Sequence, residues 1–136
     1  MSNLAIMSAL QTRLLAMPSG IAKAQTAWPG TVFNPTADVP YQRVSLIPAP
    51  PLNYSGLSPF KRLSGIFQVD FCYPFGGGSG LADAQADALA AWFPQGLSAT
   101  ANSVTTRVDR TPEIKSGRVE GDRWVIPVRI TYFANI

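Results

Sequence analysis

The fold of this chain is decided by three consecutive pieces of its sequence, which are Gly65-Ile-Phe-Gln-Val-Asp-Phe-Cys-Tyr-Pro74, Phe75-Gly-Gly-Gly-Ser-Gly80 and Leu81-Ala-Asp-Ala-Gln-Ala-Asp-Ala-Leu-Ala-Ala-Trp-Phe-Pro94. The first piece alternates with the period of a β-strand. One face of this strand would carry Phe67, Val69, Phe71 and Tyr73, and the other Ile66, Gln68, Asp70 and Cys72. We expect the aromatic face to line the core.

The third piece predicts an amphipathic helix over residues 81–93. The residues that we expect to face the sheet are Leu81, Ala84, Ala88, Leu89, Trp92 and Phe93. Asp83, Gln85 and Asp87 would then face solvent. The small alanine side chains permit a close approach of helix to sheet.

The glycine turn between strand and helix suggests a nucleotide site, but its surroundings argue against one. A phosphate-binding loop needs a Lys directly after its last glycine, whereas here Leu81 follows and no Lys or Arg occurs between Arg62 and Arg107. Asp83 would repel a phosphate at the start of the helix. The third glycine of a dinucleotide fingerprint is replaced by Leu81 or Asp83, depending on the alignment. We therefore interpret the turn as a flexible connection.

The rest of the chain predicts one more helix and three more strands. Leu4, Met7, Leu10, Leu14 and Met17 recur at helical spacing before Pro18. Strands are expected over residues 41–47, 103–109 and 124–133. Pro127 removes a backbone donor from the last of these, which predicts that this strand is bulged or lies at the sheet edge.

The resulting order is α-β-β-α-β-β, which indicates an α+β fold in a single domain spanning residues 1–136. We expect an antiparallel sheet of about four strands with both helices packed on one face.

The composition excludes most catalytic classes. The chain has no histidine and one cysteine, Cys72, so the usual zinc sites, a disulfide and every His-dependent catalytic arrangement are missing. Asp83 and Asp87 lie one helical turn apart, but they fit a solvated helix face better than a catalytic pair. No segment approaches the ~18 apolar residues of a membrane span. We expect no enzyme activity, no metal, no cofactor and no membrane association.

A proline-rich segment over residues 48–63, which we call the arm, is the most suggestive candidate for an interaction site. Loops of this length that carry large apolar side chains are usually functional or disordered. Its apolar residues are Leu52, Tyr54, Leu57 and Phe60, and its basic residues are Lys61 and Arg62. A partner-binding arm is favoured over a loop packed on its own domain. Arg129 and Thr131, on the strand with Pro127, are further candidates for a subunit interface.

Four stretches, in this order and spacing, resemble the tail terminator proteins of long-tailed bacteriophages and prophages. They are Gly65–Pro74, Gly76–Gly80, Ala84–Pro94 and Trp124–Tyr132. The resemblance covers about two thirds of the chain. It implies a structural virion protein, made in the host cytoplasm, that forms a ring, usually a hexamer, at the head-proximal end of the tail tube. Such a ring stops tube polymerisation, contacts the head connector, and lets DNA pass without sequence-specific binding.

Two other functions remain open at this stage. One is a related head-to-tail joining or minor tail protein. The other is a small-molecule-binding or enzymatic domain that uses the glycine turn. The mass of the protein in solution separates the assembly functions from the small-molecule-binding or enzymatic one. A ring whose formation depends on concentration favours assembly, whereas a tight monomer with a closed pocket favours the small-molecule-binding or enzymatic domain.

Overall fold

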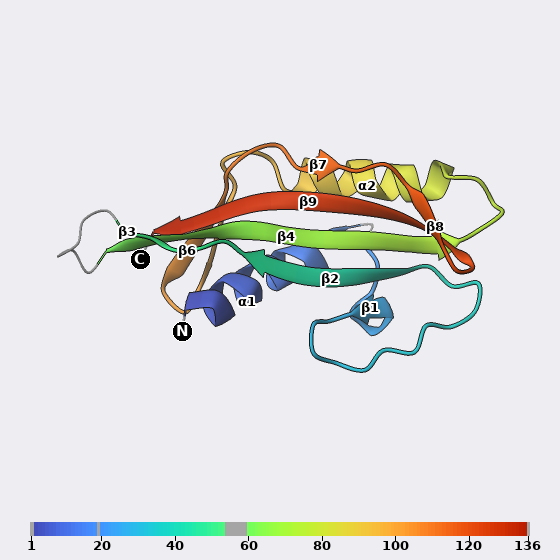
Figure 1. Ribbon diagram of the computed structural model, residues 1–136, viewed down its shortest axis with the longest axis horizontal. Helices are drawn as coiled ribbons and strands as arrows, with labels where there is room; N and C mark the ends of the chain where they lie inside the picture. The colour runs from blue at the N-terminus through green and yellow to red at the C-terminus, as the bar shows by residue number, and fades with distance from the viewer. Residues whose placement is uncertain (1, 19, 54–59, 136) are drawn as a thin grey trace.

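The computed structural model describes residues 2–18, 20–53 and 60–135 (Figure 1). Its helices are α1 (Ser2–Leu15) and α2 (Gly80–Trp92), with a 3-10 turn at Lys23–Gln25. Its strands are β1 (Thr26–Ala27), β2 (Tyr41–Pro48), β3 (Leu52–Asn53), β4 (Lys61–Pro74), β5 (Ser98–Ala101), β6 (Val104–Val108), β7 (Glu113–Ile114), β8 (Arg118–Glu120) and β9 (Arg123–Asn135).

The two longest strands, β4 and β9, form the centre of the sheet. They pair antiparallel from Arg62 opposite Asn135 to Pro74 opposite Arg123. Aromatic and β-branched residues alternate along both, a pattern that suits a pleated surface buried on one side. Figure 1 shows that these strands run along most of the longest axis of the molecule.

The predicted sheet of about four antiparallel strands is wrong. Within the described residues the sheet contains nine strands, ordered β1-β2-β4-β9-β6-β5, with β3 paired to β4, and β7 and β8 paired to β9. It is mixed, because β1 pairs with β2 in parallel. The strands β1, β3, β7 and β8 have only two or three residues each, so they are too short to produce an alternating pattern and exist by pairing with a long neighbour.

The single strand expected over residues 103–109 is the second half of a hairpin. Ala101 of β5 pairs with Val104 of β6 across a two-residue loop. Both loop residues, Asn102 and Ser103, have positive φ angles, of 50° and 65°. Positive φ at both positions is the requirement of the tight hairpin turn that matches strand twist. The usual glycine is missing from this loop, which explains why the sequence pattern did not reveal it.

Two alternatives were predicted for the strand with Pro127, a bulge or a place at the sheet edge. The edge position is wrong, because β9 pairs with β4 on one side and with β6, β7 and β8 on the other. The carbonyl of Pro127 accepts a hydrogen bond from Lys115 N, at 2.9 Å. The backbone of Pro127 therefore faces the break between β7 and β8. The sheet does not need a backbone N–H at this place, so the donor that proline lacks costs no hydrogen bond between strands.

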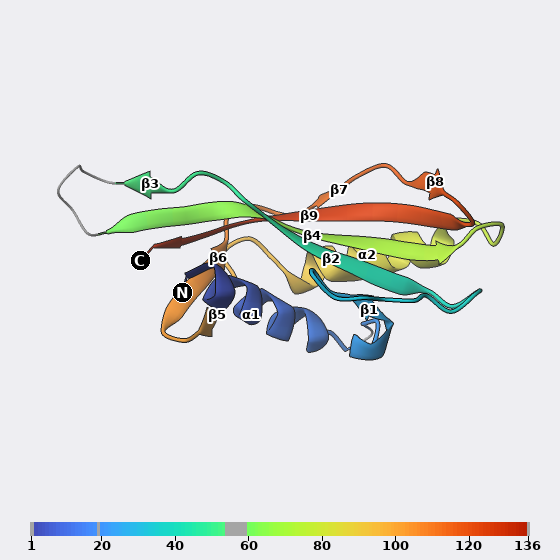
Figure 2. The ribbon, with the colours of Figure 1, turned by 60° about the horizontal axis from the view of Figure 1, so that its bottom comes forward.

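Both helices pack on the same face of the sheet and share one core (Figure 2). Trp92 of α2 donates its indole N–H to the carbonyl of Arg13 in α1, at 2.7 Å, and Arg13 Nη2 donates to the carbonyl of Trp92, at 2.8 Å. The guanidinium also lies 3.8 Å from the centre of the Trp92 rings. These contacts join the two helices end to end. Among the described residues, no helix is long and apolar enough to cross a membrane.

The buried face of α2 differs from the predicted one. Its buried residues are Ala82, Ala86 and Leu89, followed by Phe93 at the end of the helix, whereas Leu81 is 75% exposed. The buried positions recur every three or four residues, as one helix stripe requires. Leu81 was predicted to face the sheet because it is hydrophobic. The small side chains of Ala82 and Ala86 face the sheet instead, and they let the helix lie closer to it.

The opposite face of the sheet is covered at one end. Asp70 and Cys72, which share this face as expected, are both buried. Arg43 donates to the Asp70 carboxylate, at 3.0 Å. The guanidinium of Arg123 donates to the carbonyls of Thr36 and Val39, at 2.7 and 2.5 Å, and so holds the chain before β2 against β9. Cys72 is thus a small packed residue.

Candidate protein interaction surfaces

The arm continues the sheet beyond its body. Leu52 pairs with Arg62, and Asn53 with Lys61, so the two sides of the arm form a short hairpin of β3 and β4 at one end of the molecule (Figures 1 and 2). The exposed fractions of Leu52 and Phe60 are 56% and 63%. Tyr54 and Leu57, the other two predicted anchors, lie outside the described residues.

The basic residues of the arm are held at its base. Arg62 Nε donates to Asn135 Oδ1, at 3.1 Å, and its guanidinium lies 4.4 Å from the Phe133 ring centre. Lys61, next to it, is half-buried. Arg62 is therefore positioned by β9 rather than freely solvated, and it presents a fixed positive charge beside Leu52.

Arg62 and Thr131 line one groove, of about 440 Å³, between the arm base and the segment after β6. Asp109 and Arg110 lie on its other side and form an ion pair at 3.6 Å. Arg129 is not among the lining residues. It is half-buried in β9, opposite Gln68 and Glu113, and its Nε is buried without a hydrogen-bond partner in the described part of the chain.

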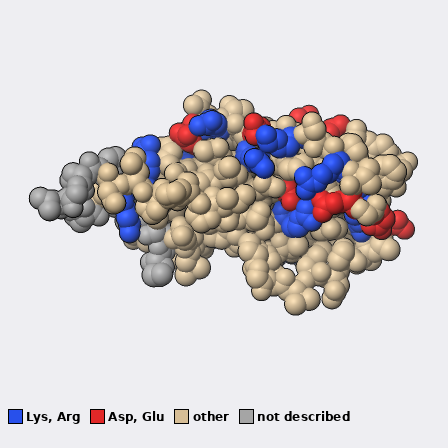
Figure 3. Space-filling model, in the orientation of Figure 1, with Lys and Arg blue, Asp and Glu red and all other residues tan. Residues whose placement is uncertain are grey.

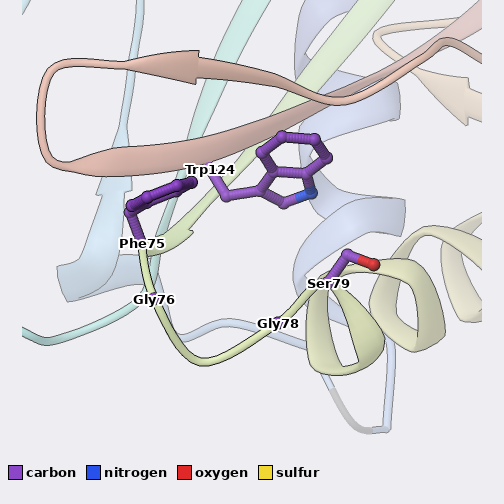
Figure 4. A pocket seen from close by; sticks show the side chains of 5 residues that line it. All are labelled: Phe75, Gly76, Gly78, Ser79 and Trp124. Atoms are coloured by element: carbon purple, nitrogen blue, oxygen red, sulfur yellow. The ribbon is translucent and has the colours of Figure 1, made fainter.

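A second apolar surface surrounds the glycine turn at the other end of the molecule. A pocket of about 270 Å³ is lined by Phe75, Gly76, Gly78, Ser79 and Trp124 (Figure 4). The two glycines have φ angles of 107° and 81°, which side chains rarely adopt, so the turn can curve around the pocket only with glycine. We call this the turn pocket.

Exposed apolar side chains surround the turn pocket. Phe75 is 60% exposed, Leu81 is 75% exposed, and Val119, which pairs with Trp124, is 53% exposed. The sequence interpretation missed this surface, because it treated the turn only as a connection. Two large apolar residues that directly flank a glycine run, Phe75 and Leu81, were the available signal.

The acidic residues near the turn pocket have no basic neighbours in α2. Asp83 accepts a hydrogen bond from Ser79 Oγ, at 3.0 Å. Asp122 lies on the other side, where its carbonyl accepts from Phe75 N at 3.0 Å. Its side chain is 87% exposed and forms an ion pair with Arg123, at 3.9 Å. No Lys or Arg occurs between Arg62 and Arg107, so α2 contributes only negative charge to this end.

The arginines at the same end are neutralised by acids. Arg43 lies 3.0 Å from Asp70 and 3.3 Å from Glu120, and Arg118 lies 3.2 Å from Glu120. Desolvation lowers the pKa of Arg43, but the bonds to Glu120 and Asp70 outweigh this and raise it overall. The bond from Arg43 likewise lowers the pKa of Glu120. Figure 3 shows blue and red side chains intermingled over this half and only blue ones beside the arm.

Nothing in the described residues resembles a catalytic centre. No group of three or more His, Cys, Asp or Glu side chains there could hold a metal ion. Burial raises the pKa of the Cys72 thiol, although Tyr41 and Arg43 oppose this. A buried thiol with a raised pKa is a poor nucleophile at neutral pH.

The family model of the phage tail terminator protein matches residues 5–132, nearly the whole chain. The chain belongs to this family. No curated protein matches the sequence significantly. A solved structure superposes with a TM-score of 0.79 and 26% sequence identity, covering 98% of this chain and 96% of that chain.

Membership of the tail terminator family gives the chain a structural role in phage tail assembly and makes it a component of the virion tail. The family resemblance identified from the sequence is thereby confirmed. Family membership also implies contacts with tail tube and head components. A structural role of this kind is carried out through protein interaction surfaces.

Proposed function

We propose that this chain is the subunit of a homo-oligomeric ring, built from six copies, that caps the head-proximal end of the tail tube. The ring stops polymerisation of the tube and provides the surface for attachment of the head connector. DNA passes through its lumen without sequence-specific recognition. The observation that carries the proposal is the match of the tail terminator family to residues 5–132.

The distribution of exposed apolar side chains supports this proposal. A ring of identical subunits needs two different complementary surfaces on each subunit, because each copy meets its neighbours head to tail. The arm and the turn pocket offer such surfaces at opposite ends of the longest axis (Figure 1). The low charged fraction, 14%, is consistent with a surface that other subunits partly cover.

We assign eight residues to contacts with subunits or with the tube, of which Tyr54 and Leu57 lie outside the described residues. They are Leu52, Tyr54, Leu57, Phe60, Lys61, Arg62, Arg129 and Thr131. Large apolar side chains would anchor these contacts, and the basic ones would adjust association rate and salt dependence.

The test is a tube-length assay. The tail tube protein of the same phage is polymerised with and without this chain, and tube lengths are measured by negative-stain electron microscopy. We expect short tubes capped at one end in its presence and continued growth in its absence. An equal amount of heat-unfolded chain is the control. Unchanged tube lengths together with a monomeric mass at high concentration would contradict the proposal.

A further inference from the structure

The sheet has an open edge at each end of its strand order. At one end, β1 pairs with β2 only at Gln42 and Arg43, so the described part of the chain places no strand beside residues 44–48. At the other end, β5 pairs with β6 alone. An open edge presents backbone N–H and C=O groups that can pair with another chain.

The register of β2 shows which of its backbone groups are free. Ala49 N donates to the Ser64 carbonyl, at 2.8 Å. Backbone groups alternate in direction along a strand, so every second residue before Ala49 also points to β4, and Val44 and Leu46 point to the open edge. The parallel pairing with β1 reaches no further than the Val44 N–H. The Val44 carbonyl and both backbone groups of Leu46 are left without a strand partner among the described residues.

The free groups of β5 follow from the same alternation. Val108 N donates to the Leu97 carbonyl, at 2.9 Å, so Leu97 and Ala99 point to β6. The backbone groups of Ser98 and Thr100 therefore point to the other open edge.

Neither edge carries the usual protection against pairing. Residues 44–47 and 98–101 include no charged side chain, and Ile47 is 47% exposed. Natural edge strands are commonly protected by lysine, proline or a bulge. Here Pro48 ends the open part of β2 but leaves the groups before it available. Both edges therefore suit the addition of a further strand.

Strand direction decides how two copies would meet. Four antiparallel steps lead from β2 through β4, β9 and β6 to β5, so β2 and β5 run in the same direction. A rotation about an axis along these strands preserves that direction. It would therefore bring β5 of one copy beside β2 of the next as a parallel strand.

The faces of the sheet favour the same arrangement. In a parallel pair, a residue that points its backbone groups to the partner strand lies opposite one that points them away, which places Leu46 opposite Ala99. Leu46 packs against the core, and Ala99 lies opposite the buried Thr106, so both side chains are on the face that carries the helices. Antiparallel pairing would instead oppose Leu46 to Ser98 or Thr100, whose hydroxyls lie on the exposed face.

We propose that β5 of one copy adds to the open edge of β2 in the next copy as a parallel strand, with Leu46 opposite Ala99. The Val44 carbonyl accepts from Ser98 N, Leu46 N donates to the Ser98 carbonyl, and the Leu46 carbonyl accepts from Thr100 N. The two added strands do not overlap, because β1 ends opposite Arg43 and β5 would begin opposite Ser45.

The contact uses a different edge on each copy, so its repetition generates a ring when the rotation closes. This inference rests on the proposed ring. It adds a backbone contact between neighbouring copies to the side-chain surfaces assigned above.

The first test removes one backbone donor. Thr100→Pro deletes the N–H that would donate to Leu46, whereas the matched control Thr100→Ala keeps it. Thr100 is exposed and its N–H points away from β6, a position that proline tolerates at a sheet edge. We expect loss of rings in Thr100→Pro at concentrations where Thr100→Ala forms them, with similar unfolding temperatures of the two monomers. Mass distribution and thermal unfolding measure both.

The second test is a disulfide between copies. Ile47→Cys and Thr100→Cys, opposite each other in the proposed register and on the same face, are combined in one chain and oxidised with copper phenanthroline. The native Cys72 is buried and should not interfere. We expect a ladder of disulfide-linked products up to the full ring. The control combines Ile47→Cys with Thr105→Cys, an exposed residue one strand further from the edge, and should give no ladder.

The cross-link decides the inference even where Thr100→Pro lowers the stability of the monomer. Rings or capped tubes without a ladder in the Ile47→Cys, Thr100→Cys chain would overturn this inference and leave the proposed function standing. Normal rings of the Thr100→Pro variant would do the same. Absence of rings and of capped tubes from the unsubstituted chain would overturn both.

Discussion

At the scale of single residues, Gly65 of β4 is closely packed against β2 and β9. A Cβ atom at this position would lie 2.7 Å from the Tyr132 hydroxyl and 2.9 Å from Pro48 Cα, and would collide with the carbonyl of Ile47. Two of these three neighbours are backbone atoms, which cannot move aside without displacing β2. We expect Gly65→Ala to lower the free energy of unfolding by about 1–3 kcal/mol in urea denaturation, as overpacking usually does.

Tyr132→Phe tests how much of the stability lost in Gly65→Ala comes from the Tyr132 hydroxyl and how much from the backbone of β2. The Tyr132 hydroxyl is buried and has no hydrogen-bond partner in the described part of the chain, so its removal alone should cost little. Combined with Gly65→Ala, it should recover only a fraction of the lost stability. Full recovery would show that the hydroxyl alone restricts this position.

The Cys72 thiol gives a second prediction at this scale. Burial raises its pKa, so less of the reactive thiolate is present at neutral pH than in an exposed cysteine. We expect native protein to react slowly with maleimide and unfolded protein to react at the rate of a free thiol. Rapid labelling of the native protein would show that this part of the sheet opens readily, contrary to the burial of Cys72.

At the scale of elements, the orientation of α2 can be tested with two leucines. Leu89 is fully buried and Leu81 is 75% exposed. Leu89→Ala should lower the free energy of unfolding by about 2–5 kcal/mol because it leaves a cavity, whereas Leu81→Ala should change it by less than about 0.5 kcal/mol. Thermal and urea unfolding measure both. Similar losses for the two variants would mean that α2 is rotated toward the face predicted from hydrophobicity.

The elements that could be predicted from the sequence are those long enough to repeat their pattern. The alternation of Phe67, Val69 and Phe71 identified β4 and its buried face, and β9 was equally clear. The short strands β1, β3, β7 and β8 form by pairing with distant segments, so no local sequence pattern predicts them. Pro127 suggested an edge strand because a local rule about backbone donors takes no account of a break between two neighbouring strands, β7 and β8.

At the scale of the whole molecule, the candidate surfaces were predictable only in part. The arm stood out because apolar residues among prolines are unusual in a loop. The turn pocket did not, because Phe75 and Trp124 are distant in sequence and meet only when β8 and β9 fold beside the end of β4. A surface built from separate segments needs the topology before it can be recognised.

Charge reversal at the arm base tests whether it takes part in assembly of the proposed ring. Lys61→Glu, beside the exposed Phe60, should raise the concentration needed for ring formation at low salt. Exposed pairs contribute only about 0.2–1 kcal/mol, but a ring repeats the contact in every subunit. High salt should reduce the difference. Lys23→Glu, a reversal at another exposed residue, is the matched control and should change little. The measurement is the mass distribution over a concentration series, with thermal unfolding of each variant alongside. Unchanged assembly of the Lys61→Glu variant at low salt would show that the arm base lies outside the subunit contacts.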